Sequence, residues 1–453
     1  MDQMICNRSF RHYWKIYAEI ALLSMLCVSQ YLGISALNLM LSGCVLIIHF
    51  LMDDIEECTI GLFCAMPAFN LINIRVGSIS FYYVMVFIYW IRHFQHYGWR
   101  INRTKFIILF AAFLIRLTSA SDIKGVLTWF VLFSVLVLSF REEYLDRNIC
   151  QVVFFASIVF LITSLAGYFM LKAGKSIYTG GTVWAGKVMS FRFAGVIGDP
   201  VFFSQCCSLL AACTLTLACY HKRYLLVGVL FAGCCLLLCL ESYAKTGMLL
   251  IALCAVASVV WLIWNRLQNK RTAVFSILMT FSCVVGAAFL LNYIVTNTDN
   301  LIIQNYVTRL SRDDLLTGRT EIWAHYISLL GDSWRSLICA LPASDFFRVF
   351  AISGGSRFHD THNVFLESAC LFGIIPTLCM LMLVFVLMYR CFISRKGILW
   401  QMPICVMLAS GVTLHGHLEF HYYTLVAIAF SFLRCNQADT WSIPIEDTNK
   451  GRR

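Results

Sequence analysis

One stretch near residue 360 gathers side chains that can carry chemistry directly before a long apolar run. Its members are His359, Asp360, His362 and Asn363. Asp360 or Thr361 is expected to cap the following helix, and His362 and Leu366 would then share one helical face. An imidazole at a membrane–water boundary suits proton transfer because its pKa lies close to neutral pH. The stretch therefore predicts a proton acceptor at the mouth of a hydrophobic helix.

A second candidate is an arginine that precedes a predicted helix start. After Arg192 come Gly195 and Gly198, and then Asp199-Pro200, which typically begins a helix with aspartate as the cap and proline in the first turn. One interpretation is a simple loop that re-enters the membrane, and spacing alone favours it. The functional interpretation places Arg192 and the helix amides against an anion.

Arg319 is the third candidate. The order Thr317-Gly318-Arg319, followed by Ile322 and Trp323, predicts a helix capped by the threonine. A guanidinium presents a fixed fork of donors that matches phosphate oxygens, although a single arginine in a loop is most often a solvated charge. We expect residues 295–361 to form an external loop with one or two amphipathic helices on the membrane surface.

Two further groups of polar residues have alternative interpretations. Glu241 and Lys245 are spaced for a helical ion pair, and an anion-binding role for Lys245 is an equal alternative. A later cluster consists of His415, His417, Glu419 and His421. With His359 and His362 it could assemble a zinc site, but no HExxH motif is present, and we interpret the cluster as polar residues at the outer membrane edge. We therefore predict no metal.

The elements that position these residues are hydrophobic spans. The chain has 453 residues, of which 60% are hydrophobic and 13% charged, a composition that excludes a soluble globular protein. Its 21 cysteines lie mostly in apolar runs without a CxxC pair, which argues against zinc-knuckle and redox motifs. The sequence therefore predicts an all-α polytopic membrane protein.

We expect about fourteen spans, or about twelve if one hairpin is re-entrant or interfacial. They fall at residues 14–33, 34–51, 57–73, 77–92, 105–119, 124–140, 149–171, 200–220, 224–240, 246–264, 273–294, 362–389, 399–416 and 418–434. An N-terminal transmembrane bundle is expected over residues 1–190 and a catalytic transmembrane region over residues 191–434. Residues 435–453 form a cytoplasmic tail.

Charge placement predicts the orientation of these spans. With a cytoplasmic N-terminus, the short basic loops fall inside, as the positive-inside rule requires. These loops are residues 92–105, 141–148, 221–223, 265–271 and 390–398. The acidic run 53–57 also falls inside, but acidic residues have little topological weight. Both termini are then cytoplasmic and the candidate residues lie on the extracytoplasmic face. The net charge of +11 is mostly topological, so nucleic acid is not an expected partner.

In four ordered motifs the chain resembles the O-antigen ligase and O-antigen polymerase superfamily. The motifs are Arg192…Gly195…Asp199-Pro200, Ser242…Lys245, Thr317-Gly318-Arg319…Ile322-Trp323 and His362-Asn363…Leu366…Gly373. The resemblance covers about residues 190–390 and is most specific in the last two motifs. It implies a metal-free membrane glycosyltransferase of the GT-C type. Its substrates would be undecaprenyl-diphosphate-linked oligosaccharides on the extracytoplasmic face.

The resemblance also implies roles for individual residues. Arg192 and Arg319 match the arginines that bind the diphosphate, and His362 matches the histidine proposed to activate the acceptor hydroxyl. Two positions depart from the family pattern. Val201 stands where asparagine is usual, and Lys245 stands close to where a Ser-Arg pair is usual. Because lysine cannot make the bidentate contact of arginine, Lys245 would contribute charge without that geometry.

These observations lead us to expect a polymerase of surface-polysaccharide repeat units (O-antigen, capsule or exopolysaccharide) in the bacterial inner membrane. Lys245, Asn363, His359 and Trp323 are expected to help bind the substrate, and no cofactor is required. Membrane lipid, a chain-length regulator and a flippase are candidate partners. The alternative is a ligase that transfers glycan to lipid A-core. A lipid or solute transporter is less favoured because the sequence has no internal repeat.

Overall fold

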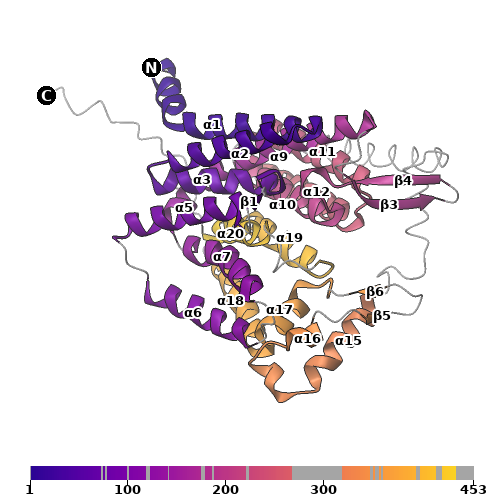
Figure 1. The fold of residues 1–453 in the computed structure, drawn as a ribbon. Helices are drawn as coiled ribbons and strands as arrows, with labels where there is room; N and C mark the ends of the chain where they lie inside the picture. Colours follow the sequence, from indigo (N-terminus) through magenta and orange to yellow (C-terminus); the bar gives the residue numbers. More distant parts are fainter. Residues whose placement is uncertain are drawn as a thin grey trace.

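The structure is a computed structural model of the whole chain. It describes residues 2–72, 75–76, 79–98, 102–118, 123–140, 142–174, 179–185, 188–220, 224–267, 319–346, 350–351, 357–358, 361–393, 398–414 and 421–434. Figure 1 shows an assembly of helices with three short strand pairs. The statements below concern these ranges.

Six helical segments within these ranges are long and apolar enough to cross a bilayer. They are Ile55–Ile72, α9 (Ile149–Lys172), α10 (Pro200–Tyr220), α11 (Leu225–Ser242), α12 (Lys245–Leu267) and α18 (Ile374–Ile393). Shorter apolar helices are α2 (Ser35–Phe50), α7 (Ile123–Ser139), η6 (Ile398–Gln401) with α19 (Met402–Gly411), and α20 (Tyr422–Arg434). The predicted all-α polytopic membrane protein is confirmed.

The N-terminal helices pack around one buried segment. In chain order they are α1 (Asp2–Leu32), α2, α3 (Ile55–Ala65), η1 (Met66–Ala68), α4 (Phe69–Ile72) and α5 (Phe81–His96), with the strands β1 (Arg75–Val76) and β2 (Ile79–Ser80) before α5. The Asp54 side chain caps α3 by accepting from the Glu56 amide at 2.9 Å. From there the chain through α4 is almost wholly buried against α1, α5 and α9.

A polar contact inside this bundle joins three helices. Glu19 Oε1 of α1 lies 3.7 Å from His49 Nδ1 of α2, and both side chains are fully buried. Cys58 Sγ of α3 lies 3.5 Å from the other ring nitrogen of His49. Removing one partner of such a buried pair leaves an uncompensated polar group, so this contact specifies how the three helices assemble.

The C-terminal half is built around α10, which is buried along most of its length and packs on α9, α11, α12 and α19. Two glycines allow its closest helix crossings. A Cβ atom at Gly247 of α12 would lie 2.5 Å from Ser204 Cβ, and one at Gly228 of α11 would lie 2.8 Å from Ala218 Cβ. Helix–helix packing in membranes commonly uses small residues in this way.

Three peripheral parts surround these helices. The first comprises α6 (Arg103–Leu117) and α8 (Glu143–Arg147), on either side of α7 in the chain. The second is an antiparallel hairpin of β3 (Thr179–Ala185) and β4 (Val188–Phe193). The third comprises α15 (Arg319–Gly331), η5 (Trp334–Leu337), α16 (Ala343–Phe346), β5 (Phe350–Ala351), β6 (Arg357–Phe358) and α17 (Val364–Phe372). In Figure 1 the strand pairs β3–β4 and β5–β6 lie on the right of the helix bundle, and α15 lies at its lower right.

The described helices overlap all but two of the expected spans as single runs, because continuous apolar segments in lipid satisfy their backbone groups only as helices. The expected span 273–294 lies outside the described residues. The single span expected over 362–389 is wrong, since the structure divides it into α17 and α18 at Gly373. The β3–β4 hairpin falls in a segment that we had interpreted only as a loop. The division at residue 190 stays a prediction.

The break at Gly373 gives a testable effect on stability. Gly373 has φ of +95°, and a Cβ atom there would lie 2.8 Å from the Ile338 carbonyl carbon. Gly373→Ala should therefore lower the free energy of unfolding by about 1–3 kcal/mol, because both the backbone conformation and the contact resist a side chain. Thermal unfolding of the purified protein in detergent measures this. Gly233→Ala in α11, where nothing lies within 4 Å of the added carbon, should not destabilise. Equal losses in both variants would contradict the assignment.

Candidate functional site

The end of strand β4 brings Arg192 to the start of α10. The chain turns through η2 (Gly195–Ile197), and the positive φ angles of Gly195 (53°) and Gly198 (84°) make this turn possible. Asp199 Oδ1 then accepts from the amides of Val201 at 2.7 Å and Phe202 at 3.0 Å. The predicted helix start, with Asp199 as the cap and Pro200 in the first turn, is confirmed.

Arg192 is fixed to the end of another helix. Its Nε–H donates to the carbonyl oxygen of Ser242, the last residue of α11, at 3.1 Å. A cation at the carboxyl end of a helix is favoured by the helix dipole and by the unpaired terminal carbonyls. The guanidinium is half-buried there, so its position is set by both the hairpin and α11.

A helical ion pair between Glu241 and Lys245 requires one continuous helix across residues 241–245. Tyr243 interrupts the helix at this point. Its φ of 52° and ψ of 30° place it in the left-handed region, while its side chain is buried. Glu241 therefore lies in the last turn of α11 and Lys245 begins α12, and the two residues share no helical face. Glu241 accepts from Lys172 Nζ and Tyr168 Oη of α9, at 3.3 and 3.2 Å. The expected helical spacing of Glu241 and Lys245 is wrong.

Helix α15 carries Arg319 toward the histidine stretch. It begins at Arg319, and Ile322, Tyr326 and Leu330 form its buried face, as expected for an amphipathic helix. The Trp323 indole N–H donates to the Thr361 carbonyl oxygen at 3.1 Å. Trp323 thus joins the first turns of α15 to the residue before His362. The predicted cap, Thr317, lies outside the described residues.

His362 sits in a constrained loop. Its φ is 49°, and with Tyr243 it is one of two non-glycine residues in the described ranges with positive φ. On either side of it, the Thr361 hydroxyl donates to the Asn363 carbonyl at 3.0 Å and accepts from the Asn363 amide at 3.3 Å. Backbone strain of this kind persists where surrounding contacts over-determine it, and it gathers at functional sites.

Asn363 caps the helix that follows. Its Oδ1 accepts from the amides of Phe365 and Leu366, both at 3.0 Å. The expectation that Asp360 or Thr361 would be the cap is wrong, because the left-handed turn at His362 delays the helix to Val364. Asn363 therefore has a structural role in addition to the substrate contact that we expected of it.

The arginine and histidine segments meet around the end of α19. Thr246 Oγ1 of α12 lies 3.3 Å from Thr413 Oγ1, just beyond that helix. A Cβ atom at Gly411 would lie 3.5 Å from Val364 Cβ, at the first turn of α17. A continuous series of contacts thus runs from the Arg192–Ser242 bond, through the start of α12 and the end of α19, to the His362 loop and α15. The segments that carry Arg192, Lys245, Arg319 and His362 are therefore linked through neighbouring elements.

Of the remaining candidate histidines, the structure describes only His421. His359 and the residues 415–420 lie outside the described ranges. His421 is fully buried, with its ring centroid 5.5 Å from that of Phe69 and 5.2 Å from that of Phe202. Its ring packs in an aromatic cluster, and its place at the outer membrane edge stays a prediction. Among the described residues, no group of three or more His, Cys, Asp or Glu side chains is arranged to hold a metal ion.

Two features of the site were missed by the sequence reasoning. Tyr243 in the left-handed region has no signal in the sequence, because glycine or asparagine is the usual residue there. Glu367, one turn after Asn363, is buried in α17. An ionisable residue inside a span is a recognised functional signal, so the position of Glu367 in a predicted span could have drawn attention to it.

The cap at Asn363 can be tested by paired substitutions. Asn363→Ala removes both acceptor contacts and should cost about 1 kcal/mol of stability, and it should reduce activity by loosening the His362 loop. Asn363→Asp keeps an acceptor oxygen and should retain both the melting temperature and most of the activity. Thermal unfolding and a glycan-transfer assay on the two purified variants measure these effects. An aspartate variant as impaired as the alanine variant would contradict the cap as the main role.

Comparison with protein families gives one match. Residues 229–381 match the family model described as O-antigen ligase. The match covers about a third of the chain and includes the start of α12, the first turns of α15 and the His362 loop. Comparisons with curated proteins and with solved structures gave no match. The match supports the resemblance of residues 229–381 to the O-antigen ligase and polymerase superfamily.

Proposed function

We propose that the protein is a membrane glycosyltransferase that polymerises surface-polysaccharide repeat units. The growing glycan leaves undecaprenyl diphosphate and is transferred to a sugar hydroxyl of the next lipid-linked unit. The observation that supports the proposal is that one series of contacts links the segments that carry Arg192, Arg319 and His362. These segments provide cations suited to a diphosphate and an imidazole suited to a hydroxyl.

The proposed reaction needs stabilisation of the leaving diphosphate and an acceptor for the proton of the attacking hydroxyl. As the bond between the sugar C1 and the diphosphate oxygen breaks, its electron pair stays on the lipid diphosphate, and Arg192 and Arg319 stabilise that charge. The acceptor hydroxyl forms the new C1–O bond and transfers its proton to His362. Lys245, at the start of α12, adds positive charge near the same helix end without the bidentate geometry of arginine.

The backbone conformation around His362 supports its proposed role as the proton acceptor. The positive φ and the flanking Thr361–Asn363 hydrogen bonds hold its backbone in one conformation. Such preorganisation lowers the cost of bringing a base to the reacting hydroxyl. Trp323 connects this loop to the helix of Arg319, so the position of the base is coupled to one of the arginines.

The second candidate function is ligation, which the description of the matched family favours. A ligase would use the same donor and the same leaving group, but its acceptor would be lipid A-core. In either case we propose that the reaction takes place on the extracytoplasmic face of the bacterial inner membrane with both termini in the cytoplasm. A flippase would supply the lipid-linked unit, and a chain-length regulator would act on the polymer.

Reconstitution with different acceptors tests this proposal. The purified chain in liposomes is given an undecaprenyl-diphosphate-linked repeat unit, with or without lipid A-core. A polymerase yields a ladder of longer lipid-linked glycans without lipid A-core. If glycan is transferred only when lipid A-core is present, the protein is a ligase. If the lipid-linked unit crosses the bilayer without bond formation, the protein is a transporter and the proposal is wrong.

A further inference from the structure

The turn that follows α15 exposes apolar side chains and buries a polar one. Trp334 of η5 is 72% exposed, and Leu337 and Ile338 after it are 45% and 50% exposed. Ser336 between them is only 2% exposed, and its hydroxyl donates to the Ser333 carbonyl oxygen at 2.6 Å. A turn in water normally has the opposite arrangement, and a group of exposed apolar side chains marks a contact surface. We call Trp334, Leu337 and Ile338 the η5 edge.

Hydrogen bonds hold the η5 edge in this orientation. The Ser333 hydroxyl accepts from the Arg335 amide at 3.3 Å and caps the turn. The Cys339 amide donates to the Arg335 carbonyl oxygen at 2.8 Å, and the Leu341 amide donates to the Cys370 carbonyl oxygen of α17 at 2.7 Å. The backbone of the turn is therefore fixed both to itself and to α17, so the outward position of its apolar side chains is part of the fold.

Helix α15 does not cover the η5 edge, because its own apolar face packs inward. Ile322, Tyr326 and Leu330 are buried, and the Tyr326 hydroxyl donates to the Phe346 carbonyl oxygen of α16 at 3.0 Å. On another side of the helix, Ile327 is 60% exposed. The η5 edge, rather than the apolar face of α15, is therefore the surface that this part of the chain offers to an apolar environment.

The η5 edge adjoins an exposed apolar stripe on α18. A Cβ atom at Gly373 would lie 2.8 Å from the Ile338 carbonyl carbon, so Ile338 lies beside the first turn of α18. In that helix Ile375, Leu378 and Met382 are 48%, 54% and 67% exposed, and their spacing of three and four residues places them on one face. Because α18 is long and apolar enough to cross a bilayer, this face contacts lipid.

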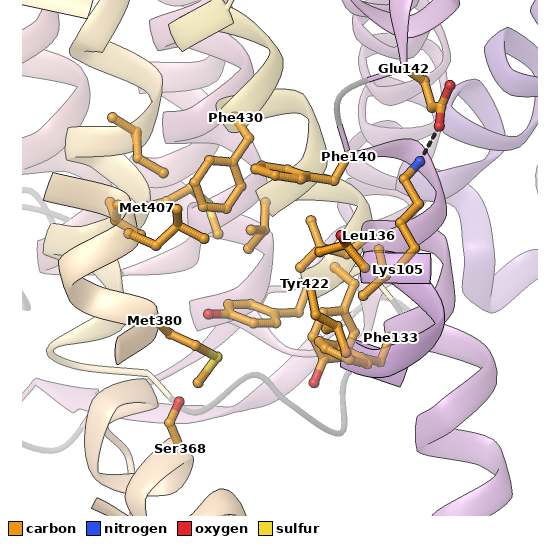
Figure 2. Close-up of a pocket in the computed structure, with 18 of the residues that line it drawn as sticks. Lys105, Phe133, Leu136, Phe140, Glu142, Ser368, Met380, Met407, Tyr422 and Phe430 are labelled. Atoms are coloured by element: carbon orange, nitrogen blue, oxygen red, sulfur yellow. Dashed lines mark hydrogen bonds and ion pairs between the residues drawn. The ribbon is translucent and has the colours of Figure 1, made fainter. Parts of the chain in front are cut away.

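The other side of α18 faces the inside of the bundle. Met380 lines a cavity among α7, α18, α19 and α20, and Figure 2 shows it beside Ser368 of α17 and Tyr422 of α20. Leu378 and Met380 are two residues apart in a helix of about 3.6 residues per turn, so they point to opposite sides. The stripe that begins at Ile375 is therefore the lipid-facing side of α18, and the η5 edge lies at its start.

We propose that the η5 edge inserts into the surface of the bilayer beside the first turns of α18. Leu337 and Ile338 meet acyl chains, and the indole of Trp334 combines an apolar ring with an N–H donor, which suits the boundary with the headgroups. The partner is lipid rather than a second protein, because the edge continues a surface that lipid already covers. Insertion does not depend on the proposed function, since it follows from exposure and packing alone.

Insertion gives the segment that carries Arg319 two fixed points. The η5 edge is held in the bilayer, and the Trp323 indole is bonded to the Thr361 carbonyl oxygen at 3.1 Å. Between Arg319 and the turn, the 13 residues of α15 rise about 20 Å at about 1.5 Å per residue. The membrane therefore contributes to the position of Arg319 relative to the His362 loop.

Photo-cross-linking identifies what covers the η5 edge. Trp334 is replaced by benzoylphenylalanine in the full chain, which is reconstituted in nanodiscs of phosphatidylethanolamine and phosphatidylglycerol and illuminated. Mass spectrometry should find phospholipid adducts on peptides that contain residue 334. The same replacement of Glu321, an exposed residue in the first turn of α15, should give none. Adducts at both positions, no adduct at residue 334, or cross-links to a second copy of the chain without lipid adducts would overturn the proposal.

Hydrogen exchange tests the insertion with two substitutions of the same residue. In nanodiscs, Trp334→Leu should keep the wild-type exchange rates of the amides of residues 336–339. Trp334→Glu should make these amides exchange on the order of tenfold faster, because a carboxylate opposes insertion of the turn. Peptides from residues 322–330 should be unchanged in both variants, which shows that α15 stays folded. Equal exchange in the leucine and glutamate variants would show that water, and not lipid, surrounds the edge.

Discussion

Substituting His362 by asparagine is expected to abolish most glycan transfer while leaving the fold and donor binding intact. Asparagine tolerates the left-handed backbone conformation that His362 adopts at φ 49°. The substitution therefore removes the base without forcing the loop to rearrange. Loss of a general base typically costs on the order of 10²- to 10⁴-fold in rate. Single-turnover transfer with saturating donor measures this effect.

A nearby histidine provides the control for this experiment. His325 lies in α15, one turn beyond Glu321, and has no assigned role in the reaction. His325→Ala should retain wild-type transfer, and both variants should keep the wild-type melting temperature and the wild-type affinity for undecaprenyl diphosphate. Transfer by His362→Asn within a few-fold of the wild type would show that another group accepts the proton.

Replacing Arg192 is expected to have the second large effect. The Nε–H of Arg192 is bonded to the Ser242 carbonyl, so the guanidinium can be held in place while it presents a fork to phosphate oxygens. Lysine keeps the charge but loses this geometry. We expect Arg192→Lys to lower kcat on the order of 10²- to 10³-fold, as for the loss of one donor that stabilises transition-state charge. Arg319→Lys should behave in the same way.

Arg335 is the matched control because it is an exposed arginine in η5. Arg335→Lys and Arg335→Ala should leave kcat unchanged, which separates a general effect of positive charge from a positioned guanidinium. A donor with a monophosphate in place of the diphosphate should also be transferred poorly by the wild type. Full activity of both Arg192→Lys and Arg319→Lys would contradict bidentate recognition of the leaving group.

The helical spans were predictable because lipid leaves a hydrophobic segment few ways to pair its backbone. The divided span at Gly373 was not, since its cause is the close approach of Ile338 and Cys339 from a distant segment. The β3–β4 hairpin lies outside the apolar runs, where hydropathy gives no signal. The local hydropathy pattern therefore predicts the positions of the helices. It does not predict the breaks that packing against distant segments causes.

The sequence motifs identified the candidate site residues but did not predict the contacts between the segments that carry them. The cap at Asp199 followed from the Asp-Pro pair, because capping is a local interaction. The helical spacing of Glu241 and Lys245 was not found, because Tyr243 ends α11 in a left-handed conformation that its residue type does not predict. The Thr246–Thr413 contact joins residues far apart in the chain. The spacing of residues within the sequence motifs does not predict this contact.

The central claim is that one site breaks the bond to a lipid diphosphate and uses His362 to activate the acceptor. The most direct measurement counts both products from the purified, reconstituted chain supplied with a lipid-linked repeat unit and no nucleotide. One undecaprenyl diphosphate should be released for each glycosidic bond formed, and both products should be lost together in His362→Asn and Arg192→Lys. Bond formation without release of the diphosphate, or unchanged yields of both products in these variants, would contradict the account.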